Sequence, residues 1–320
     1  MAAALPALSL KAEEPIFSSR TLPLYVQTKI FLVAGSAKAA NFAQEIIDQK
    51  KIWLRAGFTE EEIACYYVDP SPRELKGDER QFLNLAPELS GCYPASVALI
   101  RKHLQLIGKG QEKPPFLYLY VTSHGEPPLS YDLSKARSPR AEITLLEKKI
   151  KYPVLNQYLL RIDGLPDREG VTFSDLLNEY QEGKDPEDLF LTPLFLRNLL
   201  QTSFKDVPKF VVLQGCYTGG FADDPNPPFR DQTLTSLSPL TLLTASRFDR
   251  PSFGCQTGET STYFGGIFNE VLNDMAADPL RMDWKGLFEQ VKEKVKAREK
   301  AERQALPSEP VFFSNAPSSR

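Results

Sequence analysis

The sequence of 320 residues predicts an α/β fold built on a mostly parallel sheet. Short apolar runs alternate three times with amphipathic segments, and strands joined through helices pair in parallel with right-handed crossovers. Two of the apolar runs also end directly on reactive side chains, at His124 and at Cys216. Open parallel sheets carry their chemistry at the carboxyl ends of their strands, so both observations indicate the same class of fold.

Six apolar runs are predicted as strands. Continuous apolar runs bounded by glycine, proline or polar residues are typical of strands that are buried on both faces. The predicted strands are 29–34, 63–68, 116–122, 209–214, 240–245 and, as a closing edge strand, 311–313.

Five segments are predicted as helices because their apolar residues recur every three or four positions. Gly57 is a natural end for the first helix, and Thr192-Pro193 is a typical beginning for the third. The predicted helices are 38–56, 95–107, 193–200, 263–275 and 284–303. The last alternates Lys and Glu and is expected to present a solvated face.

The chain is predicted to form one domain at 25–315, with a loose extension at 1–24 and a tail at 316–320. The segment 71–80 is polar and is expected to be a loop. The segment 130–190 is charged and punctuated by proline, with one possible strand at 158–162 and a short helix near 173–180. It is long for a connection inside a domain, so it is predicted to be an insertion that acts as a lid, a subdomain or a processing region.

Composition excludes several classes of function. The formal net charge of −3 provides no basic field for nucleic acid or for an anionic membrane. No apolar run approaches the roughly 20 residues that a membrane-spanning helix needs. The first residues resemble neither a secretory signal nor a transit peptide, so a cytoplasmic location is expected.

The chain has four cysteines and two histidines. Four cysteines without a CxxC pair are too few for a disulfide scaffold at this length, and two histidines make a Cys/His metal site unexpected. Cys65 lies inside a predicted strand and is expected in the core. Packing is the expected role of Cys92 and Cys255, and His103 is expected on the solvated surface of a helix.

The remaining cysteine and histidine form a candidate catalytic pair. If the strands ending at His124 and Cys216 are neighbours, both side chains face one crevice. Cys216 could then act as a nucleophile with His124 as its base, and the N–H groups of Gly125 and Cys216 could hold an oxyanion. The simpler alternatives are a buried structural cysteine and a histidine in an ordinary turn.

The motifs around this pair resemble a known family. The run 214–219 (Gln-Gly-Cys-Tyr-Thr-Gly) is similar to the Gln-Ala-Cys-x-Gly signature of caspases. The wider pattern is closer to the legumain family of cysteine peptidases, particularly its bacterial members, and 120–125 (Tyr-Val-Thr-Ser-His-Gly) resembles that family's histidine motif. Other segments that resemble it are 33–36, 41–42, 56–63, 243–255 and 261–265.

This resemblance covers most of 28–128 and 191–275, and it implies a caspase-like three-layer sandwich with helices on both faces of the sheet. It implies Cys216 as the nucleophile and His124 as the general acid and base. Asn41 would be an auxiliary residue near the histidine, with the cap of the first helix as an equal alternative. Ser252 would lie in the wall of the substrate pocket.

Four positions depart from the legumain pattern. The basic and acidic pocket residues of that family are replaced here by Ala43, Gln214 and Gly266, and the acid before the histidine is replaced by Ser123. The resemblance therefore implies the nucleophile, the base and the oxyanion groups, but it does not carry a preference for asparagine.

The function expected from the sequence is that of a cysteine endopeptidase acting on peptides or proteins through a thioacyl-enzyme intermediate. This chemistry needs no metal or organic cofactor. A transamidase or ligase with the same pair, or a non-catalytic binding protein with the same fold, are the alternatives. The sequence does not indicate the oligomeric state.

Overall fold

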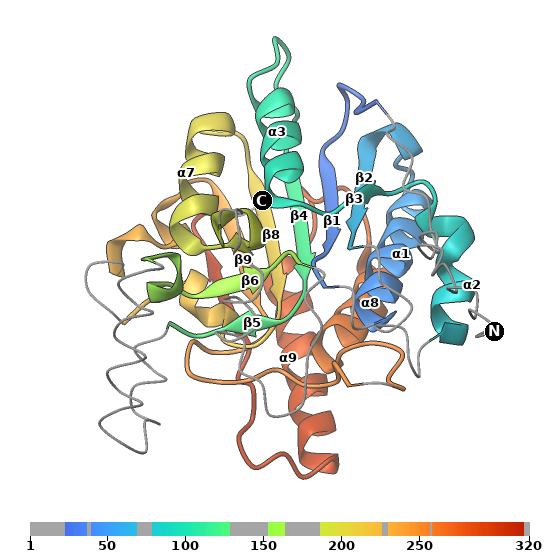
Figure 1. Ribbon diagram of the computed structural model, residues 1–320, viewed down its shortest axis with the longest axis vertical. Coiled ribbons are helices and arrows are strands. Elements are labelled where there is room, and N and C mark those ends of the chain that lie inside the picture. The colour runs from blue at the N-terminus through green and yellow to red at the C-terminus, as the bar shows by residue number, and fades with distance from the viewer. Residues whose placement is uncertain are drawn as a thin grey trace, which may run out of the picture.

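A seven-stranded sheet forms the centre of the molecule (Figure 1). The computed structural model describes residues 23–36, 40–68, 79–128, 153–163, 186–225, 230–256 and 258–316. The strands of this sheet are β1 (Ile30–Ala34), β2 (Ile63–Tyr67), β3 (Tyr93–Pro94), β4 (Leu117–Thr122), β8 (Lys209–Gln214), β9 (Leu240–Thr244) and β10 (Val311–Ser314). Their order is β10-β9-β8-β4-β1-β2-β3, and every pair is parallel except β9 with β10.

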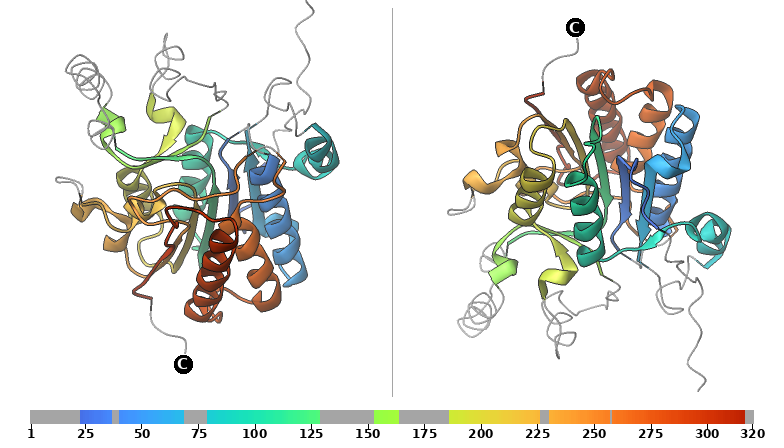
Figure 2. Two further views of the ribbon diagram at one scale, coloured as in Figure 1. Left: turned by 90° about the horizontal axis from the view of Figure 1, so that it is seen from below. Right: turned by 90° about the horizontal axis from the view of Figure 1, so that it is seen from above.

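Helices cover both faces of this sheet, as the two views of Figure 2 show. On one face lie α1 (Ala40–Arg55), α2 (Glu79–Leu89), α8 (Tyr263–Met275) and α9 (Trp284–Ala301). On the other lie α3 (Val97–Gly108) and α7 (Pro193–Ser203). The prediction of an α/β three-layer sandwich with a mostly parallel sheet is confirmed, and all six predicted strands are present.

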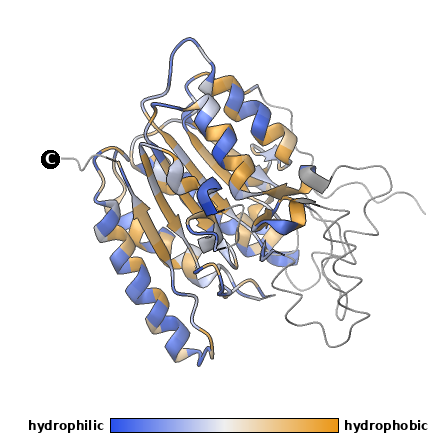
Figure 3. Cartoon of the chain, turned by 90° about the vertical axis from the view of Figure 1, so that its left-hand side faces the viewer, coloured by the Kyte–Doolittle hydropathy of each residue, from blue (hydrophilic) through white to orange (hydrophobic). Residues whose placement is uncertain are grey.

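The central strands are apolar along their length because both of their faces are buried. In β1, Ile30 and Leu32 contact the α1 side, whereas Phe31 and Val33 contact the α3 side. Side chains of a strand alternate between faces, so a strand between two helix layers needs apolar residues at every position. Figure 3 shows this pattern as hydrophobic strands between helices whose outer faces are hydrophilic.

Side-chain caps begin several helices where the sequence indicates. The hydroxyl of Ser96 accepts from the N–H of Leu99 at the start of α3, and that of Thr192 accepts from Phe195 before the Pro193 that opens α7. Each cap satisfies one backbone donor that the first turn of a helix leaves without a partner. The beginnings of α3 and α7 are therefore set locally.

A smaller sheet lies beside the carboxyl end of β4. It consists of β5 (Gly125–Glu126), β6 (Leu159–Arg161) and β7 (Phe190–Leu191), in that order and antiparallel. The possible strand at 158–162 is confirmed as β6. The predicted helix near 173–180, the extension up to residue 22 and the end of the tail lie outside the described residues, and the proposed division into domains stays a prediction.

Two local predictions are wrong. Helix α2 was not predicted, since Pro87 inside it masks the pattern, and its first two residues fall in the predicted loop 71–80. His103 is buried on α3, with its Nδ1 2.8 Å from Tyr66 Oη, and burial lowers its pKa. Helix α9 has the solvated face that its Lys and Glu residues predict, and its other face packs against the sheet. The residues of that face are Trp284, Leu287, Phe288, Val291 and Val295.

Cys65 and Cys92 form a disulfide, which the sequence did not predict. Cys65 is buried, as expected, but it is bonded as well as packed. The cause is the pairing of β2 with β3: Tyr66 lies opposite Tyr93, so the residue before each comes within bonding reach, with 4.7 Å between the two Cα atoms. A strand as short as β3 leaves little trace in the sequence.

No helix within the described residues combines the length and the apolar character that crossing a membrane requires.

The disulfide is expected to leave two free thiols, Cys216 and Cys255. Alkylation of the denatured protein before reduction should label two cysteines, and alkylation after reduction should label four. Reduction should lower the free energy of unfolding by about 3 kcal/mol, because the bridge closes a loop across 27 positions in the unfolded chain. Urea unfolding with and without reductant measures this change, and four labelled cysteines before reduction would contradict the pairing.

Candidate active site

The parallel pairing of β4 with β8 brings the two reactive segments together. Its register runs from Leu117 opposite Lys209 to Thr122 opposite Gln214. His124 and Cys216 each follow two residues after this last pair. The N–H of Ser123 also donates to the carbonyl of Gln214 at 3.1 Å, which extends the contact beyond the strands. The prediction that these strands are neighbours is confirmed.

Gly125 lies directly against the backbone of Cys216. A Cβ atom added to Gly125 would come within 1.9 Å of the Cys216 carbonyl oxygen, a distance that no side chain can occupy. Only glycine permits this approach. The structure thus places the Gly125 and Cys216 backbones, which carry the proposed oxyanion donors, in contact with each other.

The turn after β8 is sharp and tightly enclosed. Tyr217 has a left-handed backbone conformation (φ 60°), which is uncommon for a residue other than glycine, and its N–H donates to the Arg250 carbonyl at 2.8 Å. A Cβ atom on Gly220 would lie 2.1 Å from the ring of Tyr158, and one on Gly219 would lie 2.5 Å from the nitrogen of Phe248. The glycines are needed because chain packs on both sides of the turn.

The sulfur of Cys216 contacts Ser252 in three ways. It donates to the Ser252 carbonyl at 3.5 Å, accepts from the Ser252 N–H at 3.3 Å and lies 3.9 Å from the Ser252 hydroxyl. Burial raises the pKa of the Cys216 thiol to about 12, the nearby Cys255 adds to the shift, and the bonds from Ser252 oppose it. The resting group is therefore a neutral thiol at pH 7, held toward the predicted pocket wall.

His124 is held by the small sheet and by an aromatic ring. Its carbonyl accepts from the N–H of Arg161 at 3.0 Å, and its ring meets that of Phe42 edge-on, with centroids 5.2 Å apart. The Ser123 hydroxyl donates to the Arg161 carbonyl at 2.6 Å and is buried. Ser123 thus attaches the histidine segment to β6.

The predicted pocket residues separate into two groups. Gln214 is buried beneath the site, with its Nε2 3.5 Å from the Ser252 hydroxyl. Ala43 and Gly266 lie on α1 and α8, where Ala43 is part of the core and Gly266 packs against Ser261. The structure therefore connects Gln214, through Ser252, to Cys216, whereas Ala43 and Gly266 lie within helices.

Asn41 connects α1 to the loop that carries Ser252. Its Nδ2 donates to the Gly254 carbonyl at 2.6 Å, and the side chain is buried. Helix α1 begins at Ala40, so Asn41 lies inside its first turn and not at the cap position. Its role beside the histidine stays a prediction.

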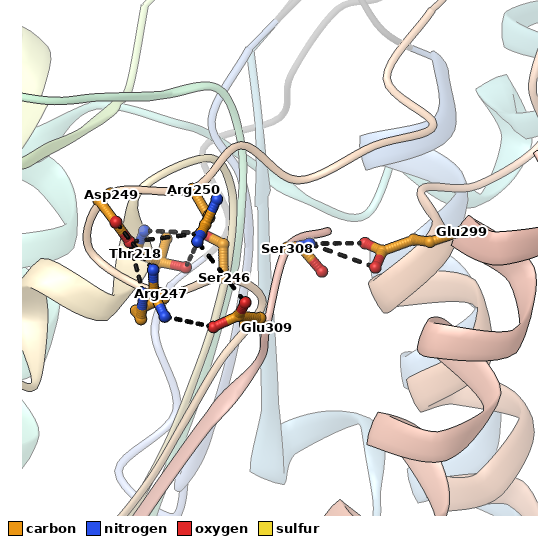
Figure 4. Close-up of polar contacts among 8 residues, drawn as sticks. All are labelled: Thr218, Ser246, Arg247, Asp249, Arg250, Glu299, Ser308 and Glu309. Atoms are coloured by element: carbon orange, nitrogen blue, oxygen red, sulfur yellow. Dashed lines mark hydrogen bonds and ion pairs between the residues drawn. The ribbon is translucent and has the colours of Figure 1, made fainter. Parts of the chain in front are cut away.

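Charged and polar contacts support the loop that carries Ser252 (Figure 4). Arg247 binds both carboxylate oxygens of Asp249, at 2.6 and 2.9 Å, and also binds Glu309 just before β10. The Ser246 hydroxyl accepts from the N–H of Thr218 at 3.2 Å. These bonds join the loop both to the segment before β10 and to the turn after Cys216, which fixes the position of the pocket wall.

Glu45 is a buried carboxyl group near the site that was not predicted to act there. It lies on α1 and accepts hydrogen bonds from the hydroxyls of Tyr120 (2.8 Å) and Thr122 (2.6 Å) and from the N–H of Thr262 (2.7 Å). Burial raises its pKa to about 7, although these bonds oppose the shift. The signal in the sequence is its spacing: Glu45 follows Asn41 by four residues, so it lies on the buried stripe of α1.

No cluster of His, Cys, Asp and Glu side chains suited to a metal ion occurs within the described residues.

Part of the chain matches a known family. A model of the Peptidase C13 family matches residues 186–311, a stretch that includes Cys216, Gln214 and Ser252 but not His124. This match supports a peptidase function of the cysteine type, with peptides or proteins as substrates. No curated protein sequence is a significant match to the chain.

Solved structures with similar folds are more distant. Caspase-1 from Spodoptera frugiperda is 13% identical over 93% of this chain and 92% of its own, with a TM-score of 0.45. A protein of Geobacter sulfurreducens is 11% identical over 91% and 95%, with a TM-score of 0.46. A structure of pro-sf-caspase-1 is 11% identical over 96% and 97%, with a TM-score of 0.47.

Glu45 should make stability depend on pH. Its pKa is near 7 in the folded protein and near 4.5 in the unfolded chain, so the folded state binds the proton more tightly. Its contribution is complete below pH 4.5 and is lost as the pH rises to 7. Relative to Glu45→Gln, the free energy of unfolding of the wild type should fall by about 3 kcal/mol between pH 4.5 and 8. Urea unfolding at both pH values measures this difference. Gln49→Met, a neutral change one turn along α1, is the control and should differ from the wild type equally at both.

Gly125→Ala should disrupt the site more than the fold. The added methyl group meets the Cys216 carbonyl, so the backbone of the turn must shift. We expect a loss of at least about tenfold in the alkylation rate of Cys216 or in turnover, since small displacements of reacting groups have large effects on rate. Gly91→Ala is the control, because a Cβ atom there comes no nearer than 3.8 Å to a neighbouring atom, an ordinary contact. Equal rates in Gly125→Ala and the wild type would contradict the contact.

Proposed function

We propose that the protein is a cysteine endopeptidase in which Cys216 is the nucleophile and His124 is the general acid and base. The observation that carries the proposal is the parallel pairing of β4 with β8. Because of this pairing, His124 and Cys216 follow the same end of two neighbouring strands, and Gly125 packs against the backbone of Cys216. The family match over 186–311 supports the same chemistry for the cysteine half of the site.

The neutral thiol determines the first step. Because burial raises the pKa of Cys216, the proton leaves sulfur for His124 as the sulfur attacks the peptide carbonyl. The carbonyl oxygen becomes an anion, for which the N–H groups of Gly125 and Cys216 are the proposed donors. His124 then gives its proton to the leaving amine as the C–N bond breaks, and a thioacyl-enzyme remains.

Water completes the cycle by the same route. His124 takes a proton from water as its oxygen attacks the thioester, and it returns that proton to the sulfur as the C–S bond breaks. An amine in place of water would make the enzyme a transamidase or ligase, which product analysis with added amine would reveal. A non-catalytic protein has no use for this arrangement, although the fold alone permits it.

The pocket favours polar recognition without a fixed charge. Gln214 and Ser252 contribute an amide and a hydroxyl beside Cys216, where the legumain pattern has an acid at position 214. We propose that the side chain before the scissile bond is recognised through hydrogen bonds.

The Leu243–Cys255 segment (Leu-Thr-Ala-Ser-Arg-Phe-Asp-Arg-Pro-Ser-Phe-Gly-Cys) supports placing the chain with bacterial members of the family.

The cytoplasmic location stays a prediction, and one observation weighs against it. The Cys65–Cys92 bond is a disulfide, and disulfides persist mainly in oxidising compartments.

The test compares the wild type with Cys216→Ala and His124→Ala on a diverse peptide library and with a thiol-directed activity probe. Turnover should fall by about a thousandfold or more in both variants, because the acylation step loses its nucleophile or its base. Probe labelling should disappear in Cys216→Ala. His103→Gln, which changes the only other histidine, is the control and should retain turnover. Equal turnover in the wild type and Cys216→Ala would refute the proposal.

A further inference from the structure

A continuous chain of polar side chains runs from α1 to the candidate nucleophile. Thr122 Oγ1 lies 2.6 Å from Glu45 Oε2 and 2.8 Å from Gln214 Oε1. Gln214 Nε2 lies 3.5 Å from Ser252 Oγ, which is 3.9 Å from Cys216 Sγ. Glu45, Thr122 and Gln214 are almost completely buried, so water cannot replace a missing bond in this part of the chain.

The number of protons restricts how these bonds can be made. The Thr122 hydroxyl has one proton but lies between two oxygens, and both are acceptors when Glu45 is ionised. One of the two contacts must then change. Either Glu45 carries a proton and donates it to Thr122, or the Gln214 amide turns so that its NH₂ group faces Thr122.

With Glu45 neutral, every bond runs in one direction. Thr262 donates its N–H to Glu45 Oε1, so the carboxyl proton is on Oε2 and is donated to Thr122. Thr122 then donates to the Gln214 oxygen, and the Gln214 amide donates to Ser252. Ser252 has accepted a bond, so its own proton is directed toward Cys216, where a donor stabilises the thiolate.

With Glu45 ionised, the direction reverses. Thr122 must donate to the carboxylate and therefore accepts from Gln214, which presents its oxygen to Ser252. The Ser252 hydroxyl then donates to Gln214, and the Cys216 sulfur loses that donor. The charge on a residue of α1 thus determines whether Ser252 donates toward Cys216.

We propose that Glu45 is a positioning residue that sets the hydrogen-bond role of Ser252 toward Cys216, acting through Thr122 and Gln214. The proposal rests on the proposed function in one respect, which is that Cys216 is the reactive thiol of the site. It predicts that Cys216 reacts faster when Glu45 is protonated than when Glu45 is ionised.

The surroundings let Glu45 change its charge near neutral pH. Burial raises its pKa to about 7, so both protonation states are populated near neutral pH. The groups that meet it are Tyr120 and Thr122 from β4 and the segment around Thr262 from α8, with the Asn269 amide on its backbone carbonyl. Of these only Tyr120 titrates, and burial raises its pKa well above the ordinary value, so it stays neutral.

The titratable groups around Cys216 must be separated from Glu45 in any test. Cys255 and Glu126 both contribute to the pKa of Cys216, and His124 follows the neighbouring strand. A comparison of rates between two proteins that share these groups removes their effect, because each contributes equally to both.

The experiment measures the alkylation rate of Cys216 by iodoacetamide from pH 5 to 9 in the full chain. Mass spectrometry of peptides separates Cys216 from Cys255. In Glu45→Gln, the N–H of Thr262 requires the amide oxygen as its acceptor, so the NH₂ group donates to Thr122. This keeps the hydrogen bonds in the direction that they have when Glu45 is neutral. The ratio of the Glu45→Gln rate to the wild-type rate should be near one below pH 6 and about fivefold above pH 8, the effect of one hydrogen bond.

Two further variants make the result specific. Thr122→Val interrupts the chain of hydrogen bonds between Glu45 and Gln214. The ratio of its alkylation rate to the wild-type rate should therefore also change through pH 7. This variant keeps the test available if Glu45→Gln does not fold. Gln49→Met alters the same face of α1 but none of the residues in the chain of hydrogen bonds. The ratio of its alkylation rate to the wild-type rate should not change with pH. A flat ratio for Glu45→Gln, or for Thr122→Val in its place, would overturn the proposal, as would a ratio for Gln49→Met that follows the same curve.

Alkylation also separates this proposal from the peptidase assignment. If no peptide is cleaved but the ratio changes with pH, the peptidase assignment fails and the role of Glu45 stands. If peptides are cleaved and the ratio stays flat, the peptidase assignment stands and the role of Glu45 fails.

Discussion

The backbone pairing between β4 and β8 is the interaction on which the candidate site depends. Both strands are buried in the middle of the sheet, so their register is held by hydrogen bonds on one side of each strand and by β1 or β9 on the other. A slip by one residue would turn every side chain of a strand to the opposite face. The position of Cys216 relative to His124 therefore follows from the packing of the whole sheet.

Three polar residues inside this core are connected to one another. Glu45, Thr122 and Gln214 come from a helix and two strands, and the low-dielectric interior requires each to find a partner. A buried acid with neighbours of this kind stabilises the fold only in one protonation state. The same bonds that satisfy it also link the helix layer to the edge where Cys216 lies.

Much of the fold and the reactive pair could be predicted because their signals are local. Apolar runs identify the strands, Ser96 and Thr192 identify two helix starts, and the residues after β4 and β8 identify the candidate pair. The disulfide could not be predicted, since it depends on a two-residue strand that pairs Tyr66 with Tyr93. Glu45 and the buried His103 were also missed, because a polar residue on an amphipathic helix reveals its partner only when the strand opposite is known.

Tyr158 next to Gly220 has a consequence for how such a chain can vary. The ring of Tyr158 fills the space that a side chain at 220 would need. The residue just before β6 and the turn after Cys216 therefore pack directly against each other. A residue larger than glycine at 220 is compatible with the fold only if position 158 becomes smaller. In related sequences, a residue larger than glycine at 220 should therefore occur only together with a smaller residue at 158, 62 positions earlier in the chain.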